Sequence, residues 1–216
     1  NAYTLGDVKK AEEYFEAAYE AAAQKPYAQI DTNSLYNAAF TSWSTENFSK
    51  AKTMFDKCLG YGYYGDGGEV FAKLSDCVSH IDTTAAGKTA AKEYLEQGFQ
   101  KFPTSESIVF GLINYYMTSG EGTDRLFELL QQAKATSPDN ASLYYVEGQA
   151  YKQIGDLDKV TLKKCIDPFE QAYVVCEDAA IKSTIAEYLK QIYYRFRDQD
   201  PKFQAGYEKY NALLNN

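Results

Sequence analysis

The chain of 216 residues carries 22 lysine and arginine side chains against 30 aspartate and glutamate side chains, a formal net charge of −8. This acidic balance argues against binding to nucleic acid or to an anionic membrane surface, since both need clustered positive charge. Apolar residues make up 45% of the sequence, which excludes a disordered chain, and no apolar run is long enough for a transmembrane helix.

Three short segments share the spacing of one helix face: 11-AEEYFEAA-18, 51-AKTMFDKC-58 and 91-AKEYLEQG-98. In each, an alanine is followed four residues later by a large apolar residue, and three residues after that by a small one. The three alanines are 40 residues apart, and a fourth copy follows at 126-LFELLQQA-133. Steps of four and three residues lie on one face of an α-helix, so each segment is predicted to be a packing helix.

A second kind of helix precedes these segments. It is clearest in 144-YYVEGQAYKQIGDLDKV-160, where Gly148, Tyr151 and Gly155 mark a close helix contact, a contact between helices and a turn. The segment 109-VFGLINYYMTSGEG-122 is similar, and no strand pattern of useful length occurs. Residues 177–216 read as a final helix pair, whose charged outer positions suit the exposed end of a repeat array. The sequence therefore predicts an all-α fold.

These pairs resemble the tetratricopeptide repeat, whose period is about 34 residues with small and aromatic landmarks. The landmarks in this sequence are Gly148, Ala150 and Tyr151 in a first helix, and Ala91, Leu95, Gly98 and Pro103 in a second. The resemblance implies an α–α superhelix, a right-handed solenoid of roughly five to six helix pairs. It also implies a single domain over 1–216, made of a partial first repeat at 1–24, repeats at about 31–60, 68–103, 104–138 and 139–176, and a C-terminal capping helix pair at 177–216.

Three places depart from this repeat. Only the end of a first helix precedes residue 11, so we expect further repeat sequence upstream of Asn1. About four extra residues, judged against the family's repeat length, are placed in the turn within 79–90. Near residue 160 the pattern shifts, because an anchor is expected at Val160 whereas good anchors come five residues later, at Cys165, Phe169 and Ala172. Either a loop intervenes there, or residues are left out between about Lys159 and Lys163, which is the alternative we favour.

The segment Gly87-Lys88-Thr89 has the ending of a phosphate-binding loop. A P-loop needs a glycine at position 82 and a strand before it, but that position is Asp82 and 70-VFAKLSDCVSH-80 reads as a helix. We therefore interpret Gly87 as a turn glycine followed by the first turn of a packing helix. A nucleotide-dependent regulator that uses this segment is kept as the weakest hypothesis.

The sequence offers little catalytic chemistry. The four cysteines, Cys58, Cys77, Cys165 and Cys176, lack CxxC spacing, and His80 is the only histidine. Neither a zinc site nor a catalytic triad is predicted, so we expect no cofactor and no enzymatic activity. Buried free thiols are expected, although a disulfide between Cys58 and Cys77 stays open. The glycine-rich 65-GDGG-68 is expected to start a helix at Glu69 and not to hold a metal ion.

In the family that the repeats resemble, the first helices line a concave groove. The resemblance implies that aromatic side chains with amides between them line it here, and such a groove suits an extended peptide. The candidate groove residues are Asn33, Tyr36, Phe40, Trp43, Phe110, Asn114, Tyr145, Gln149, Lys152 and Tyr194, with Glu69, Asp76, His80, Met117 and Arg195 at further groove positions. For any single aromatic residue, packing between repeats is about equally expected. A lysine–asparagine clamp for a carboxylate is disfavoured, since no basic cluster is present.

We therefore expect a non-catalytic scaffold that binds a protein or an extended peptide. The alternative is a homo-oligomeric structural component of a cell-envelope assembly. The acidic, tyrosine-rich repeats are also similar to exported repeat proteins of Gram-negative bacteria, which implies the periplasm or the outer membrane, while a cytoplasmic location stays open.

Overall fold

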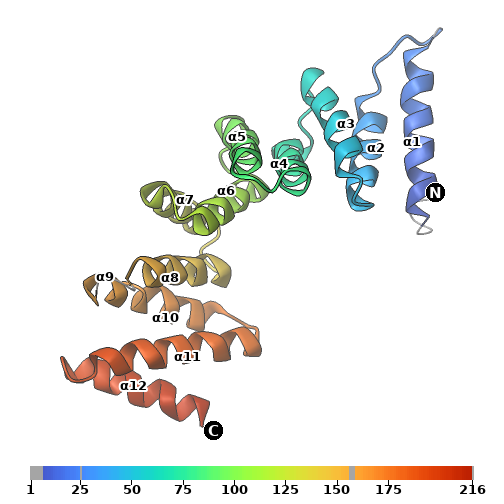
Figure 1. The fold of residues 1–216 in the computed structure, drawn as a ribbon. Coiled ribbons are helices and arrows are strands. Elements are labelled where there is room, and N and C mark those ends of the chain that lie inside the picture. Colours follow the sequence, from blue (N-terminus) through green and yellow to red (C-terminus); the bar gives the residue numbers. More distant parts are fainter. Residues whose placement is uncertain (1–6, 25, 156–158, 216) are drawn as a thin grey trace. The chain divides into compact units, whose positions relative to one another are not determined.

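The computed structural model describes residues 7–24, 26–155 and 159–215, and within these ranges the chain forms α-helices joined by short connections, with no strand (Figure 1). Two compact units, Asn1–Thr118 and Ser119–Asn216, make up the chain. The all-α fold expected from the sequence is confirmed. The division into one domain over 1–216 stays a prediction.

The helices of the first unit are α1 (Val8–Ala23), α2 (Thr32–Ser44), α3 (Phe48–Gly60), α4 (Glu69–Ile81), α5 (Ala85–Lys101) and α6 (Glu106–Ser119). The short 3-10 helix η1 (Asp66–Gly68) leads directly into α4, so the glycine-rich segment starts a helix at Glu69 as predicted. The helices of the second unit are α7 (Thr123–Thr136), α8 (Ala141–Gly155), α9 (Lys159–Lys163), α10 (Ile166–Val175), α11 (Ala179–Phe196) and α12 (Pro201–Leu214).

Four helices bury the residues that revealed the repeat, whereas on α1 only Ala11 is buried, Phe15 is half-buried and Ala18 is exposed. On α3, Ala51, Phe55 and Cys58 are fully buried. The corresponding positions are also buried on α5, on α7, and on α10 with the residue that precedes it: Ala91, Leu95 and Gly98; Leu126, Leu130 and Ala133; Cys165, Phe169 and Ala172. The steps of four and three residues therefore mark the helix face that packs in the core, as predicted.

The chain around Gly87 differs from the sequence-based expectation. The connection between α4 and α5 is only residues 82–84, and the Gly87 amide donates to the Thr84 hydroxyl at 3.4 Å, as in an N-terminal cap. Gly87 thus lies in the first turn of α5, so its interpretation as a turn glycine is wrong. The extra residues lengthen α5 to 17 residues and leave the turn short. A Cβ atom at Gly87 would collide with the Asp82 carbonyl oxygen, which explains why glycine stands there.

The shifted pattern near residue 160 corresponds to a short helix and a turn. Residues 156–158 lie outside the described ranges, α9 follows them, and the Cys165 amide donates to the Leu162 carbonyl at 3.3 Å before α10 begins. Val160 is 70% exposed, whereas Phe169 is fully buried. The good anchors are therefore buried at the start of α10, and a short helix precedes them. That residues are left out between about Lys159 and Lys163 stays a prediction.

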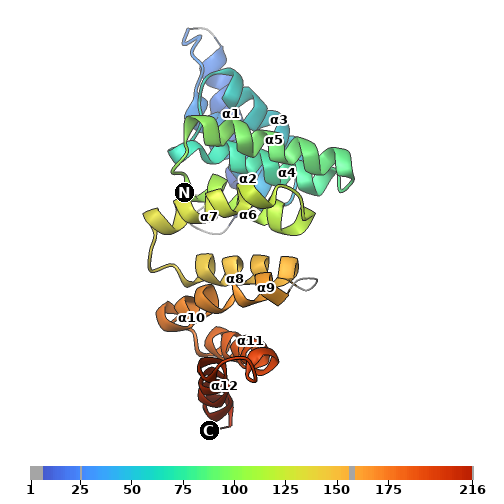
Figure 2. The same ribbon diagram turned by 90° about the vertical axis from the view of Figure 1, so that its left-hand side faces the viewer.

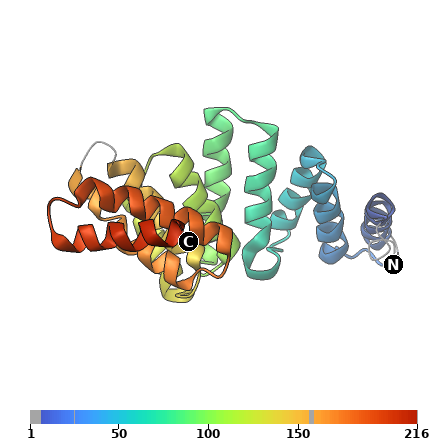
Figure 3. The ribbon, with the colours of Figure 1, turned by 90° about the horizontal axis from the view of Figure 1, so that it is seen from below.

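The last helix pair closes the second unit. Figure 1 and Figure 3 show α11 and α12 side by side and antiparallel, joined by a short turn, and Figure 2 shows the same pair nearly end-on. The hydroxyls of Tyr193 on α11 and Tyr210 on α12 both donate to Glu170 on α10, at 3.0 and 3.2 Å. One carboxylate thereby connects three helices. Asp178 and Asp200 cap the two helices by accepting backbone N–H bonds in the first turn.

An ion pair between the buried Glu12 and the partly exposed Lys50 connects α1 to the next helix pair. Glu12 is only 8% exposed, accepts from the Ser42 hydroxyl at 2.7 Å and pairs with the Lys50 ammonium at 2.6 Å. Burial acts to raise the pKa of Glu12. The hydrogen bonds from Lys50 and Ser42 together outweigh burial and hold this pKa below its ordinary value of 4.5.

This shift makes the contribution of Glu12 to stability depend on pH. Glu12→Gln is expected to lower the free energy of unfolding by about 1–3 kcal/mol at pH 7, because Lys50 loses a charged partner. Since the folded pKa is depressed, this difference is full above pH 4.5 and disappears as the pH falls through the folded pKa. Urea unfolding of both proteins at pH 7 and at lower pH measures it. Glu13→Gln, at an exposed neighbouring position, is the control, and a pH-independent difference would contradict the prediction.

Candidate functional site

In the first unit, three predicted groove residues form one aromatic row on α2. Tyr36, Phe40 and Trp43 succeed one another at steps of four and three residues, so they share a face of the helix. The ring centroids are 6.3 Å apart for Tyr36 and Phe40, and 5.6 Å apart for Phe40 and Trp43. All three side chains are half-buried, so they combine anchoring in the protein with accessible ring surface.

Two charged residues of α4 hold Trp43 in place. The Trp43 indole N–H donates to Asp76 at 2.6 Å, and the Lys73 ammonium lies 3.2 Å from the Trp43 ring centroid. The same ammonium is 5.1 Å from the Phe40 ring centroid. Burial lowers the pKa of Lys73 even though Glu69 and Asp76 oppose the shift. The result is a cation–π contact and a hydrogen bond that fix the orientation of one indole ring. We call Tyr36, Phe40, Trp43, Lys73 and Asp76 the α2–α4 site.

The other predicted residues of the first unit lie outside the aromatic row on α2, although His80 contacts Asp76. His80 stacks on Phe48 of α3 at 4.1 Å, and its Nδ1 lies 2.9 Å from the Asp76 carbonyl oxygen. Asn33 and Asn114 are exposed, while Glu69, Phe110 and Met117 are half-buried. Among the described residues, no aromatic contact joins Phe110 to the row on α2.

In the second unit, predicted residues of α8 meet a tyrosine of α11. The Gln149 amide donates to the Tyr145 hydroxyl at 2.9 Å, which joins two of the predicted residues. The Tyr188 ring centroid lies 6.4 Å from that of Tyr145, and the Lys152 ammonium is 5.4 Å from it. Tyr188 also stacks on the buried Phe169 at 5.5 Å. Tyr145, Gln149, Lys152 and Tyr188 therefore form a second polar and aromatic group.

Tyr194 lies elsewhere in this unit. It is 50% exposed, packs against Tyr207 of α12 at 5.4 Å, and carries the Arg197 guanidinium 3.6 Å above its ring. Arg195 is exposed. The described contacts of Tyr194 therefore belong to the α11–α12 pair and not to the group around Tyr145.

Two residues of these clusters were missed by sequence reasoning. Lys73 lies three residues before Asp76 on α4, a spacing that could have shown that both share a helix face. Tyr188 was missed because α11 is 18 residues long, so the tyrosine that meets α8 lies more than a turn before Tyr194. In both cases the signal depends on the register between two helices, which periodicity within one helix does not contain.

The described residues offer little for catalysis. All four cysteines are buried thiols outside any disulfide among the described residues, and burial raises the pKa of the Cys58 and Cys77 thiols to about 12. No group of three or more histidine, cysteine, aspartate or glutamate side chains in this part of the chain is placed to hold a metal ion. None of the described helices combines the length and apolar character that a membrane span requires.

Comparison with known proteins identifies the repeat. The family model of the tetratricopeptide repeat matches residues 2–25. The fold is similar to that of YrrB, a tetratricopeptide-repeat protein with an unusual peptide-binding site, at 17% identity over 84% of each chain and a TM-score of 0.63. It is also similar to MamA AMB-1, at 16% identity over 86% of this chain and 92% of that one, with a TM-score of 0.60.

A third similar structure is TTC0263, a thermophilic tetratricopeptide-repeat protein of Thermus thermophilus. It shares 19% identity over 87% of this chain and 93% of that one, with a TM-score of 0.56. The comparison with curated proteins gave no significant match. At these identities, the likeness to solved structures establishes the fold. The family model thus matches one tetratricopeptide repeat at residues 2–25, and the fold is similar to that of tetratricopeptide-repeat proteins.

Proposed function

We propose that this protein is a non-catalytic scaffold that binds an extended segment of a partner protein at the α2–α4 site. The observation that carries the proposal is the Trp43 ring, which Asp76 and Lys73 hold in one orientation while it remains half-buried. An aromatic ring that is ordered before binding loses little conformational entropy when a ligand covers it. Such rings are the usual energetic centres of protein interfaces.

The surroundings of Trp43 indicate the kind of segment. Phe40 and Tyr36 extend the apolar surface along α2, so an apolar or aromatic side chain of the ligand would lie against this row. Among the described residues, Lys73 forms no ion pair, and a hydrogen-bond acceptor of the ligand would restore part of the solvation that burial has removed. YrrB, which has the same fold, is described as having a peptide-binding site, and this supports a peptide as the ligand class.

A peptide library tests the proposal even though the partner is unidentified. Phage-displayed random peptides are selected on the immobilised full chain, and the enriched peptides are synthesised and measured by calorimetry. Trp43→Ala is expected to weaken their binding by at least about tenfold, which corresponds to about 1.4 kcal/mol. Lys73→Met is expected to weaken it less, because the apolar row remains.

The matched control is Tyr27→Ala, which removes an aromatic side chain that is 68% exposed in the α1–α2 connection. Its affinity for the same peptides should equal that of the unchanged protein. Peptides that bind the Trp43→Ala variant as tightly as the unchanged protein would show that the α2–α4 site is not where the segment binds.

A further inference from the structure

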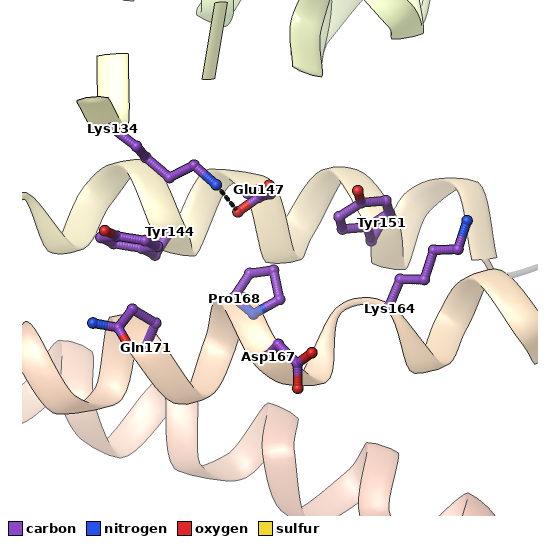
Figure 4. Close-up of a pocket in the computed structure, with 8 residues that line it drawn as sticks. All are labelled: Lys134, Tyr144, Glu147, Tyr151, Lys164, Asp167, Pro168 and Gln171. Atoms are coloured by element: carbon purple, nitrogen blue, oxygen red, sulfur yellow. Dashed lines mark hydrogen bonds and ion pairs between the residues drawn. The ribbon is translucent and has the colours of Figure 1, made fainter. Parts of the chain in front are cut away.

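A cavity of about 470 Å³ lies in the second unit, between α8 and α10. Figure 4 shows its walls: Tyr144, Glu147 and Tyr151 come from α8, Lys134 reaches in from α7, and the lower wall carries Lys164, Asp167, Pro168 and Gln171. This volume is within the range of pockets that hold small molecules.

The cavity lies at the irregularity near residue 160. In the pairs α2–α3 and α4–α5, the second helix begins after a three-residue connection and has 13 or 17 residues. In the pair α8–α10, by contrast, α9 and the turn at Lys164 precede the second helix, and α10 has only 10 residues. The lower wall of the cavity is this turn and the first part of α10, so the break in the repeat shapes the cavity. Departures from an otherwise regular pattern are expected at functional places.

A buried ion pair lies on the α8 side of the cavity (Figure 4). Glu147 is 4% exposed, and it accepts from the Lys134 ammonium at 2.6 Å and from the Gln131 amide at 3.1 Å. The same ammonium lies 5.4 Å from the Tyr144 ring centroid, and Tyr151 stacks on Phe127 of α7 at 4.4 Å. These contacts order both tyrosine rings, so the upper wall is preformed.

The remaining polar groups of the wall are available to bind a ligand. Within the described ranges, no hydrogen bond or ion pair involves the side-chain polar atoms of five lining residues: Tyr144, Tyr151, Lys164, Asp167 and Gln171. Lys164 and Asp167 carry opposite charges and are both exposed, on the turn and in the first turn of α10. The wall therefore presents one ammonium, one carboxylate, two phenols and an amide, with no net charge.

We propose that this cavity binds a small zwitterion of amino-acid or dipeptide size. The carboxylate of the ligand pairs with Lys164, and its ammonium pairs with Asp167. The Gln171 amide and the tyrosine hydroxyls supply hydrogen bonds, while the Pro168 and tyrosine rings cover the aliphatic part. Each charge contact is specific, because a ligand that lacks one of the two charges leaves a wall charge without its partner.

This cavity is distinct from the group around Tyr145. Tyr144, Glu147 and Tyr151 occupy one stripe of α8, whereas Tyr145, Gln149 and Lys152 occupy another, about a third of a turn away. The residues that line the cavity belong to the second unit and those of the α2–α4 site to the first, so either proposal can fail without the other.

Nuclear magnetic resonance of the ¹⁵N-labelled full chain tests the inference. The protein is titrated with mixtures of the common amino acids and of dipeptides, up to about 10 mM, which exceeds the dissociation constant of a weak specific site, about 1 mM. We expect the backbone amide resonances of Tyr144 and Gln171 to change their chemical shifts on binding. The best ligand is then compared with its N-acetyl form and its C-terminal amide.

The variants give a charge-specific readout. Lys164→Met should weaken binding of the zwitterion about tenfold but leave the affinity for its C-terminal amide, which lacks the carboxylate, unchanged. Asp167→Asn should likewise weaken binding of the zwitterion about tenfold but leave the affinity for its N-acetyl form, which lacks the ammonium, unchanged. Lys159→Met, at an exposed lysine of α9, is the control. If free amino acids bind more tightly than dipeptides, the ligand is a free amino acid, and the reverse order identifies a dipeptide. The absence of shifts at 10 mM, or equal binding of blocked and free forms, would overturn the proposal.

Discussion

Phe169→Ala is expected to lower the free energy of unfolding of the second unit by about 3–5 kcal/mol. Phe169 is fully buried on α10, its ring stacks on Tyr188, and it lies 5.9 Å from the ring centroid of Tyr145. Its ring also fills the space left by the missing side chain of Gly148 on α8. Truncation therefore removes contacts between three helices and leaves a cavity that the helices cannot fill without moving.

Urea unfolding followed by far-ultraviolet circular dichroism measures this loss. Val174→Ala is the control, because Val174 lies on the same helix but is 70% exposed, and its effect should stay within about 0.5 kcal/mol. A loss below about 1 kcal/mol for Phe169→Ala would mean that α10 does not pack as described.

The second large effect is expected at a glycine of the first unit. A Cβ atom on Gly98 of α5 would lie 2.8 Å from the Phe71 Cβ atom and 2.8 Å from the Ile108 side chain. Gly98→Ala is therefore expected to destabilise the protein by about 1–3 kcal/mol, even though alanine favours helix formation. Phe71 and Ile108 are both buried, so neither can move away without disturbing the core.

Gly60→Ala is the matched comparison, and its expected effect has the opposite sign. Gly60 also lies in a helix, but a Cβ atom there meets nothing within 4 Å. The substitution should be neutral or stabilise the protein by up to about 1 kcal/mol. Thermal unfolding of both variants distinguishes steric overlap at Gly98 from a general effect of replacing a helical glycine by alanine. Equal shifts of Tm would show that close packing at Gly98 does not cause the destabilisation.

The paired helices and their buried faces could be predicted because packed helices need small and large side chains at a fixed spacing, and this spacing is visible in the sequence. Ala51, Phe55 and Cys58 illustrate this, since each occupies a position that had been assigned from spacing alone and each is fully buried. The signal is local to one helix and recurs along the chain, so degenerate copies reinforce one another.

The errors have a different origin. Comparing the chain with a repeat length shows that extra residues are present, but it does not show whether they lengthen a helix or a turn. Gly87 is therefore predicted to lie in a turn, whereas it lies in α5. Lys73 and Tyr188 were missed because contacts between helices of different pairs depend on their register. Tyr36, Phe40 and Trp43 do come together, but their role in binding stays a prediction, as do the homo-oligomeric alternative and a location in the cell envelope.

The setting of Trp43 also has a spectroscopic consequence. It is the only tryptophan of the chain, so all indole fluorescence comes from the α2–α4 site. Its excited state is sensitive to the Lys73 ammonium over the ring and to the Asp76 carboxylate at the indole N–H. A ligand that displaces either group changes the intensity or the wavelength of emission. The protein therefore carries an intrinsic optical reporter of the occupancy of its proposed binding site.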